Sequence, residues 1–102
     1  MTAYFIVRAQ VVDAALKQDF DRWYQNEHLP DAKKAFKAKR AFRAWSQTEP
    51  AVHYAFYEFE DAAAAEAIRT TPEFKQLVME FDRVWGDKVT RSRDVVEVVQ
   101  AI

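Results

Sequence analysis

The chain contains no cysteine and only one glycine, Gly86, and each shortage excludes a class of site. Without cysteine there is no disulfide framework, no thiolate zinc site and no thiol nucleophile. With a single glycine the backbone cannot form the glycine-rich loops that cradle phosphates, so Rossmann and P-loop sites are excluded. Any chemistry must therefore come from other side chains.

Long apolar runs and an excess of one charge are also missing. No stretch approaches the ~20 apolar residues of a membrane-spanning helix. Lys and Arg number 15 against 16 Asp and Glu, so the formal net charge is -1 and no basic excess favours nucleic acid. The N-terminal "MTAYFIVRAQVVDA" has no basic region before a long apolar run. We therefore expect a cytoplasmic protein with no signal peptide and neither nucleic acid nor membrane as a partner.

The chain is rich in apolar and aromatic side chains. Half of its 102 residues are hydrophobic and 15% are aromatic. Aromatic side chains bury large areas, which predicts a packed core. The length predicts one domain over residues 1–102, which would gain stability from self-association because small domains bury a limited share of their surface.

Periodicity and capping residues predict four strands and three helices. Strands are predicted over 3–11, 41–47, 52–60 and 89–102. Helices are predicted from Asp13 to near His28, over 62–70 after the cap Asp61, and over 72–85 between the cap Thr71 and Gly86. Proline disfavours α geometry in the residue before it, so Pro30 predicts that the first helix stops near His28 and that "DAKKAF" restarts as a separate piece.

The order βαββαβ predicts an α+β, ferredoxin-like fold. Such units form a four-stranded antiparallel sheet with the helices on one face. Strand parity makes both faces of this sheet apolar, because Tyr4 and Ile6 oppose Phe5 in the first strand and Phe56 opposes Tyr57 in the strand over 52–59. Helices cover only one face, and an exposed apolar face indicates an interaction surface. We expect a homodimer whose two sheets pack together around a two-fold axis.

Two histidines are the first candidates for chemistry. His28 would act as a general acid or base at the space between helix and sheet, or it would cap the last helical turn. His53 shares a strand face with Tyr57 and would line the same pocket, or it would be a partly exposed surface residue. From spacing alone we prefer the structural interpretations, a helix cap for His28 and a surface residue for His53.

Arg43 and Trp45 share a strand face, a combination that suits an anionic or carbonyl substrate. Arg43 would equally pair with Glu58 across the predicted hairpin. A metal site is disfavoured, because Glu27 and His28 are adjacent on a helix and their side chains diverge by about 100°.

The segment "KKAFKAKRAFR" over 33–43 places six basic residues around two phenylalanines. Basic residues interleaved with aromatics are typical of proteins that bind single-stranded nucleic acid. An ordinary solvated turn followed by a strand is the favoured interpretation, because the acidic "EFEDAAAAE" balances the charge.

The segment "FDRWYQNEHLPDAKKAF" resembles the WYxxEHLP signature of the dimeric α+β barrel superfamily, and "FDRVWGDKVTRSR" fits the same kind of protein. Trp23, Tyr24, Glu27, His28 and Pro30 match the signature. Similar sequences often continue with Pro-Gly-Phe, whereas this chain reads "AFKAKRAF". The resemblance covers the whole βαββαβ order and is not specific for one reaction.

The resemblance implies a homodimer with one pocket per subunit between sheet and helices. Relatives include EthD-like proteins, cofactor-free monooxygenases of aromatic polyketides, lactone isomerases, polyketide cyclases and heme-degrading enzymes, although no second motif ties this chain to heme.

Two hypotheses about function follow. The first is an enzyme without a cofactor that binds a small apolar, aromatic or carbonyl molecule, with His28 as the catalytic group. The substrate-binding candidates are Trp23, Tyr24, Glu27, Arg43, Trp45, His53 and Tyr57. The second is a non-catalytic ligand-binding or accessory homodimer, and the residues alone do not separate the two.

Overall fold

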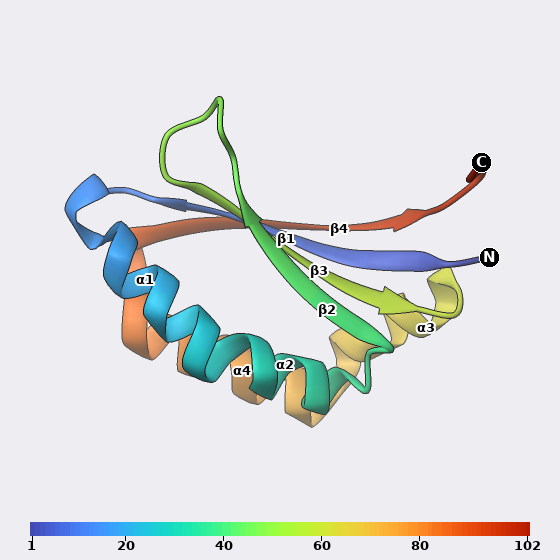
Figure 1. Cartoon of the computed structure of the whole chain (residues 1–102). Coiled ribbons are helices and arrows are strands. Elements are labelled where there is room, and N and C mark those ends of the chain that lie inside the picture. Colours follow the sequence, from blue (N-terminus) through green and yellow to red (C-terminus); the bar gives the residue numbers. More distant parts are fainter.

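The structure, a computed structural model, describes all 102 residues as one antiparallel sheet with helices on one face (Figure 1). The strands are β1 (Ala3–Val11), β2 (Arg40–Trp45), β3 (Val52–Phe59) and β4 (Val89–Glu97), in the spatial order β2-β3-β1-β4. The helical elements are η1 (Ala14–Leu16), α1 (Lys17–Trp23), η2 (Tyr24–His28), α2 (Leu29–Phe36), α3 (Ala62–Ala67), η3 (Ile68–Thr70), α4 (Pro72–Trp85) and η4 (Gly86–Lys88). The predicted ferredoxin-like βαββαβ fold is confirmed.

Three helix boundaries lie where the capping residues predict them. The carboxylate of Asp61 accepts from the Ala64 N–H, and the Thr71 hydroxyl accepts from the Phe74 N–H. Gly86 ends α4 with a φ of 54°, a conformation that glycine adopts without strain. None of these helices has both the length and the apolar character that crossing a bilayer requires.

The first helix does not stop at His28, and this prediction was wrong. The chain stays helical from Lys17 to Phe36 through a π-helical turn over Tyr24–His28, in which the Leu29 N–H bonds to the Tyr24 carbonyl. The wider turn comes directly before Pro30, which lies in the first turn of α2 and has no N–H to donate to the preceding turn. Lys37 ends the helix in the left-handed conformation, with a φ of 55°.

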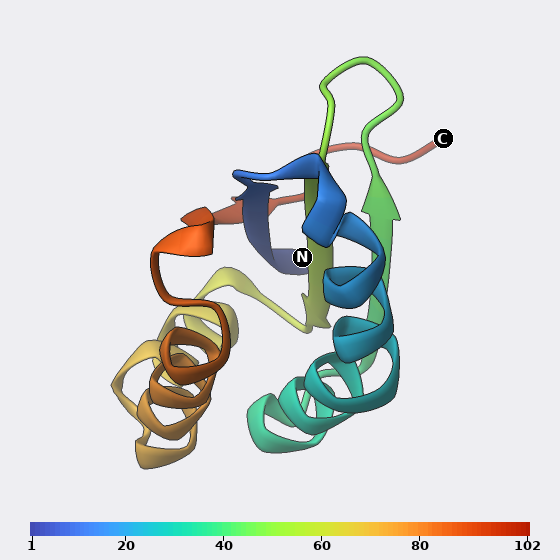
Figure 2. The same ribbon diagram turned by 90° about the vertical axis from the view of Figure 1, so that its left-hand side faces the viewer.

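The two faces of the sheet differ in what covers them. All helices lie against one face, and the other carries none (Figure 2). The covered face holds the core, which includes Phe5, Val7, Ala55 and Tyr57. The pairing of Phe5 with Tyr57 and of Ile6 with Phe56 confirms the predicted parity.

Candidate functional site

A small cavity lies inside the molecule between the sheet and the helices. The sheet supplies Phe5, Val7, Tyr57, Arg91 and Arg93. The helices supply His28, Phe36, Phe74, Val78 and Phe81. Its volume is ≈ 20 Å³, which is room for about one water molecule, and aromatic rings make up most of its lining. We call it the inner cavity.

His28 reaches the inner cavity because of the π-helical turn. Two residues five positions apart diverge by about 140° on an α-helix. In the wider turn Trp23 and His28 instead lie on the same side, and their rings stack with centroids 4.7 Å apart and an angle of 18° between planes. The Tyr24 and Phe81 rings meet the imidazole edge-on at 4.9 and 5.4 Å. Since the side chain makes no capping hydrogen bond, the helix-cap interpretation of His28 was wrong.

The surroundings of His28 keep it neutral. Burial among the rings, together with the positive charge of Arg91, lowers the pKa of His28 to about 4. A neutral imidazole has a free nitrogen lone pair, so His28 is a proton acceptor throughout the physiological pH range.

Two tyrosines accompany His28. Tyr24 is buried between the two histidines, since its ring lies 4.9 Å from His28 and 4.4 Å from His53. Burial raises the pKa of Tyr24 to about 12 and that of Tyr57 well above its usual value. The neighbouring Tyr24 also raises the pKa of Tyr57. The two hydroxyls do not meet the geometry of a hydrogen bond, and the buried Tyr57 hydroxyl has no partner. Both remain protonated, so Tyr57 offers a free donor at the inner cavity.

Arg91 and Arg93 belong to the site and were not among the predicted residues. They occupy alternate positions of β4, on the helix-covered face together with Val89 and Val95. The Arg91 guanidinium lies over the Phe81 ring at 3.9 Å and pairs with Asp82 at 2.6 Å. The sequence contained a signal for this placement. Arg91 and Arg93 alternate along the strand in step with Val89 and Val95, so all four side chains share one face.

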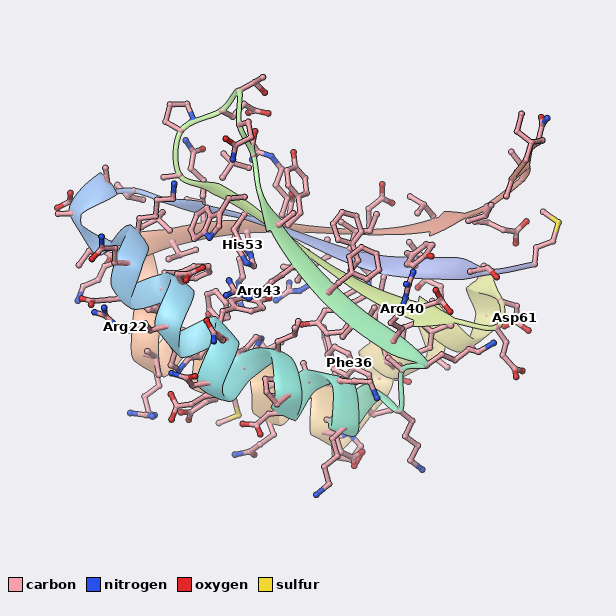
Figure 3. All side chains as sticks on the ribbon, viewed as in Figure 1. Arg22, Phe36, Arg40, Arg43, His53 and Asp61 are labelled. Carbon is pink, nitrogen blue, oxygen red and sulfur yellow. The ribbon has the colours of Figure 1, made fainter.

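His53 lies in a separate polar cluster, and Figure 3 shows it close to Arg43. It is fully buried, so the surface interpretation of His53 was wrong, and it is not among the residues that line the inner cavity with His28. Its Nε2 lies 3.3 Å from Arg43, and Asp21 accepts hydrogen bonds from Arg43 at 2.8 Å and from the Trp45 indole at 2.7 Å.

The charged groups of this cluster pair with one another. Hydrogen bonds from Arg43 and Trp45 lower the pKa of Asp21, whereas burial and the charge of Arg43 lower the pKa of His53 to about 3. Arg43 pairs with Asp21 of α1 and not with Glu58, so the predicted alternative of a cross-strand pair was wrong. Glu58 pairs with Arg40 instead.

Two further predicted features lie apart from the inner cavity. Glu27 is exposed on the outer side of the helix. In segment 33–43, Phe36 is buried in the core and Phe42 lies on the uncovered sheet face, so the basic side chains and the two rings form no common surface. No three His, Asp or Glu side chains converge on a point where a metal ion would fit.

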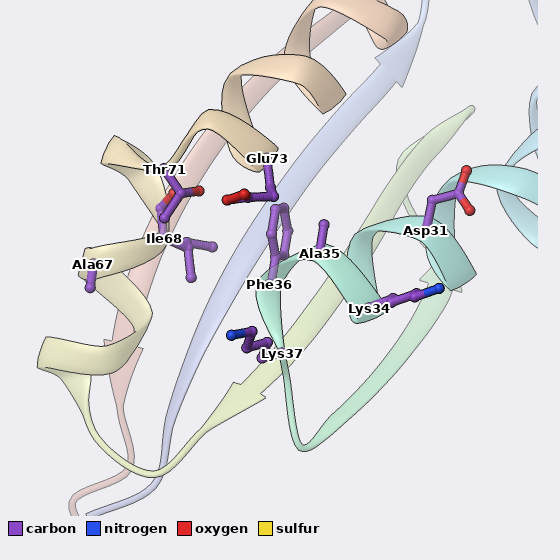
Figure 4. A pocket seen from close by; sticks show the side chains of 9 residues that line it. All are labelled: Asp31, Lys34, Ala35, Phe36, Lys37, Ala67, Ile68, Thr71 and Glu73. Carbon is purple, nitrogen blue, oxygen red and sulfur yellow. The ribbon is translucent and has the colours of Figure 1, made fainter.

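A larger hollow of ≈ 580 Å³ lies on the surface between the end of α2 and the start of α4 (Figure 4). Its walls carry Lys34, Lys37, Asp31 and Glu73, and the Phe36 ring separates it from the inner cavity. Because it has no histidine or tyrosine, we place the candidate chemistry in the inner cavity and not in this hollow.

The four-stranded antiparallel sheet with helices on one face is a fold that this chain shares with several solved structures. Its structural neighbours are EthD family and antibiotic biosynthesis monooxygenase proteins, at low sequence identity. No family model matches the chain, and no curated protein matches it.

Three solved structures illustrate the likeness of fold. HapK from Hahella chejuensis has a TM-score of 0.70 at 19% identity, over 97% of this chain and 94% of that one. An EthD family protein from Bacillus halodurans has a TM-score of 0.72 at 20% identity, over 97% of this chain and 100% of that one. SnoaB from Streptomyces nogalater, a cofactor-independent oxygenase, has a TM-score of 0.62 at 13% identity, over 99% and 96%.

Proposed function

We propose that the chain binds a small aromatic carbonyl compound in the inner cavity and removes a proton from it without a cofactor, with His28 as the base. The observation that carries the proposal is the placement of His28. It is a neutral imidazole with no capping role, held by rings at the wall of a small cavity lined mostly by aromatic side chains.

The proposed step is abstraction of a proton from the carbon next to a carbonyl or a phenolic ring. His28 accepts the proton, and the Tyr57 hydroxyl donates a hydrogen bond to the oxygen on which negative charge develops. An aromatic, water-poor cavity strengthens both interactions. The carbanion then reacts with oxygen, regains a proton at another carbon, or attacks a second carbonyl, which are the monooxygenase, isomerase and cyclase outcomes.

The expected result of replacing His28 by glutamine is a loss of about 10²-fold in proton abstraction. The low pKa of His28 makes it a weak base, which sets the effect at the lower end of the usual range. The measurement is hydrogen–deuterium exchange of 2-tetralone in D2O without oxygen, followed by proton NMR.

Asn26→Ala serves as the control, because Asn26 is exposed on the same helical turn. The control should exchange 2-tetralone at the wild-type rate, and His28→Gln should melt near the wild-type temperature. A wild-type rate equal to that in buffer would contradict the proposed chemistry.

That outcome would favour the second candidate, a ligand-binding homodimer without chemistry. Either candidate requires side chains to move before a ligand enters, because ≈ 20 Å³ admits no organic molecule.

We also propose that the protein is a homodimer joined through the uncovered sheet face. That face carries an aromatic cluster in which Phe42 stacks on Phe56 at 4.8 Å, with Tyr4 and Tyr54 beside them at 6.0 and 6.3 Å. Phe42 remains 37% exposed. A second copy of the same face would cover these rings from water.

Phe42→Asp is expected to convert the dimer into a monomer, because a two-fold axis would bring two buried carboxylates into an apolar interface. Native mass spectrometry reads the subunit count directly. Val12→Asp is the matched control, since Val12 is 65% exposed outside the sheet face. A wild-type monomer at micromolar concentration, or a Phe42→Asp dimer, would contradict the proposed interface.

A further inference from the structure

We propose that Arg91 and Arg93, with Arg69 beside them, form an anion-binding site at the inner cavity, and that its ligand is an aromatic compound bearing a carboxylate. This inference rests on the proposed function, because it assigns a ligand class to the same cavity. It adds that the ligand carries a carboxylate, which proton abstraction by His28 does not itself require.

The two arginines of β4 point toward the interior of the fold. Both line the inner cavity, and the Arg91 side chain is only 14% exposed. Arginine on the covered face of a sheet is uncommon unless the charge is paired or has a ligand to bind.

Aromatic rings hold all three guanidinium groups in place. Arg91 lies over Phe81 at 3.9 Å, Arg93 over Phe74 at 5.5 Å, and Arg69 over Phe5 at 5.5 Å. Each of these rings also lines the inner cavity. A weakly hydrated guanidinium tolerates such a position and keeps donors available for a planar carboxylate.

The acids nearby leave part of this positive charge without a partner. Asp82 pairs with Arg91 at 2.6 Å but is 58% exposed. Glu66 lies 3.6 Å from Arg69 and is 55% exposed. Arg93 takes part in no ion pair of the structure.

The arginines also repel one another. Burial and the neighbouring charge of Arg93 lower the pKa of Arg91, while burial and the charge of Arg69 lower the pKa of Arg93. A bound anion would relieve this repulsion and would accept forked hydrogen bonds from the guanidinium groups.

Tyr57 leaves the arginines free to bind the carboxylate. Its hydroxyl is fully buried and has no hydrogen-bond partner, although buried hydroxyls are almost always paired. It lies on the wall of the inner cavity with both arginines. A ligand in the cavity would place its carboxylate on Arg91 and Arg93 and its reacting oxygen at the Tyr57 hydroxyl.

A basic hollow marks the route by which such a ligand would enter. It has a volume of ≈ 370 Å³, and its walls include Arg69 and Lys75. Phe74 and Val78 line both this hollow and the inner cavity, so one layer of side chains separates them. Displacement of that layer would open the cavity where the charge attracts an anion.

The test is isothermal titration calorimetry of 2-naphthoate against its neutral analogue 2-naphthamide. The wild type should bind the naphthoate at least about tenfold more tightly, a difference of about 1.4 kcal/mol. Arg91→Met and Arg93→Met should each remove that preference by weakening the naphthoate alone. Arg83→Met is the matched control on α4, where its side chain is 70% exposed, and it should change neither affinity.

The His28 ring proton in NMR spectra locates both ligands, and melting curves check that each variant folds. Equal affinity for the two ligands, both shifting the His28 signal, would overturn the anion site and leave the proposed cavity intact. An unchanged naphthoate affinity in both arginine variants would also overturn it. Absence of any His28 shift with either ligand would overturn the anion site and the proposed function together.

Discussion

Replacement of Phe20 by alanine is expected to lower the free energy of unfolding by about 3–5 kcal/mol. Phe20 is fully buried, and its ring contacts more rings than any other side chain of the helices. These are Trp23, Tyr24, Trp45, His53, Phe81 and Trp85, at centroid distances of 5.2 to 6.2 Å. Removal of the ring leaves a cavity that rigid aromatic neighbours cannot fill.

Urea denaturation at pH 7.5 measures this effect. Met79→Ala is the control, because Met79 is 66% exposed on α4 and its truncation should change stability by no more than about 0.5 kcal/mol. A loss of under about 1 kcal/mol for Phe20→Ala would contradict the view that this ring organises the core behind the candidate site.

Acidification from pH 6.5 to 4 is expected to destabilise the protein steeply, because two histidines are buried in the neutral form. Burial lowers the pKa of His28 to about 4 and that of His53 to about 3. Charged neighbours add to the effect, with Arg91 facing His28 and Arg43 facing His53. Asp21 and Glu80 act in the opposite direction but do not outweigh burial.

Stability falls as the pH falls because the unfolded state binds more protons than the folded state. Both histidines titrate near pH 6.5 in the unfolded chain, so below that pH the unfolded state binds protons that the folded state does not. Each histidine therefore removes about 1.4 kcal/mol of stability per pH unit as the pH falls toward its folded pKa. Above pH 7 neither histidine is protonated in either state, and stability should be nearly flat.

Urea denaturation at pH 7.5, 6.5, 5.5 and 4.5 tests this expectation. His28→Gln and His53→Gln should each remove about half of the slope, because each variant leaves one titrating group. The pH series compares each variant with itself, so a uniform loss of stability would not mimic the effect. Equal stability of the wild type at pH 7.5 and 4.5 would show that neither imidazole is held neutral.

Local signals in the sequence predicted several helix boundaries and the faces of the strand over 52–59. Asp61, Thr71 and Gly86 mark helix boundaries through interactions within a few residues, so their effect does not depend on the rest of the molecule. Alternation along 52–59 predicted which strand residues share a face, because side chains in a strand point to opposite sides in turn.

Pro30 shows where local reasoning fails. Proline usually ends a helix, yet packing of Phe20, Tyr24 and Phe36 against the sheet stabilises one continuous helical segment across it. The π-helical turn that results brings His28 onto the side of Trp23. A rule based on neighbouring residues contains no information about that packing.

The sequence by itself determined the βαββαβ order and the parity of the strands over 3–11 and 52–59, since these depend on local geometry and composition. Tertiary structure alone decided which groups meet. It brings Arg91 and Arg93 of the last strand to His28 of the first helical segment, and it joins Asp21 with Arg43 and Trp45. Such meetings depend on long-range packing, which no spacing along the chain encodes.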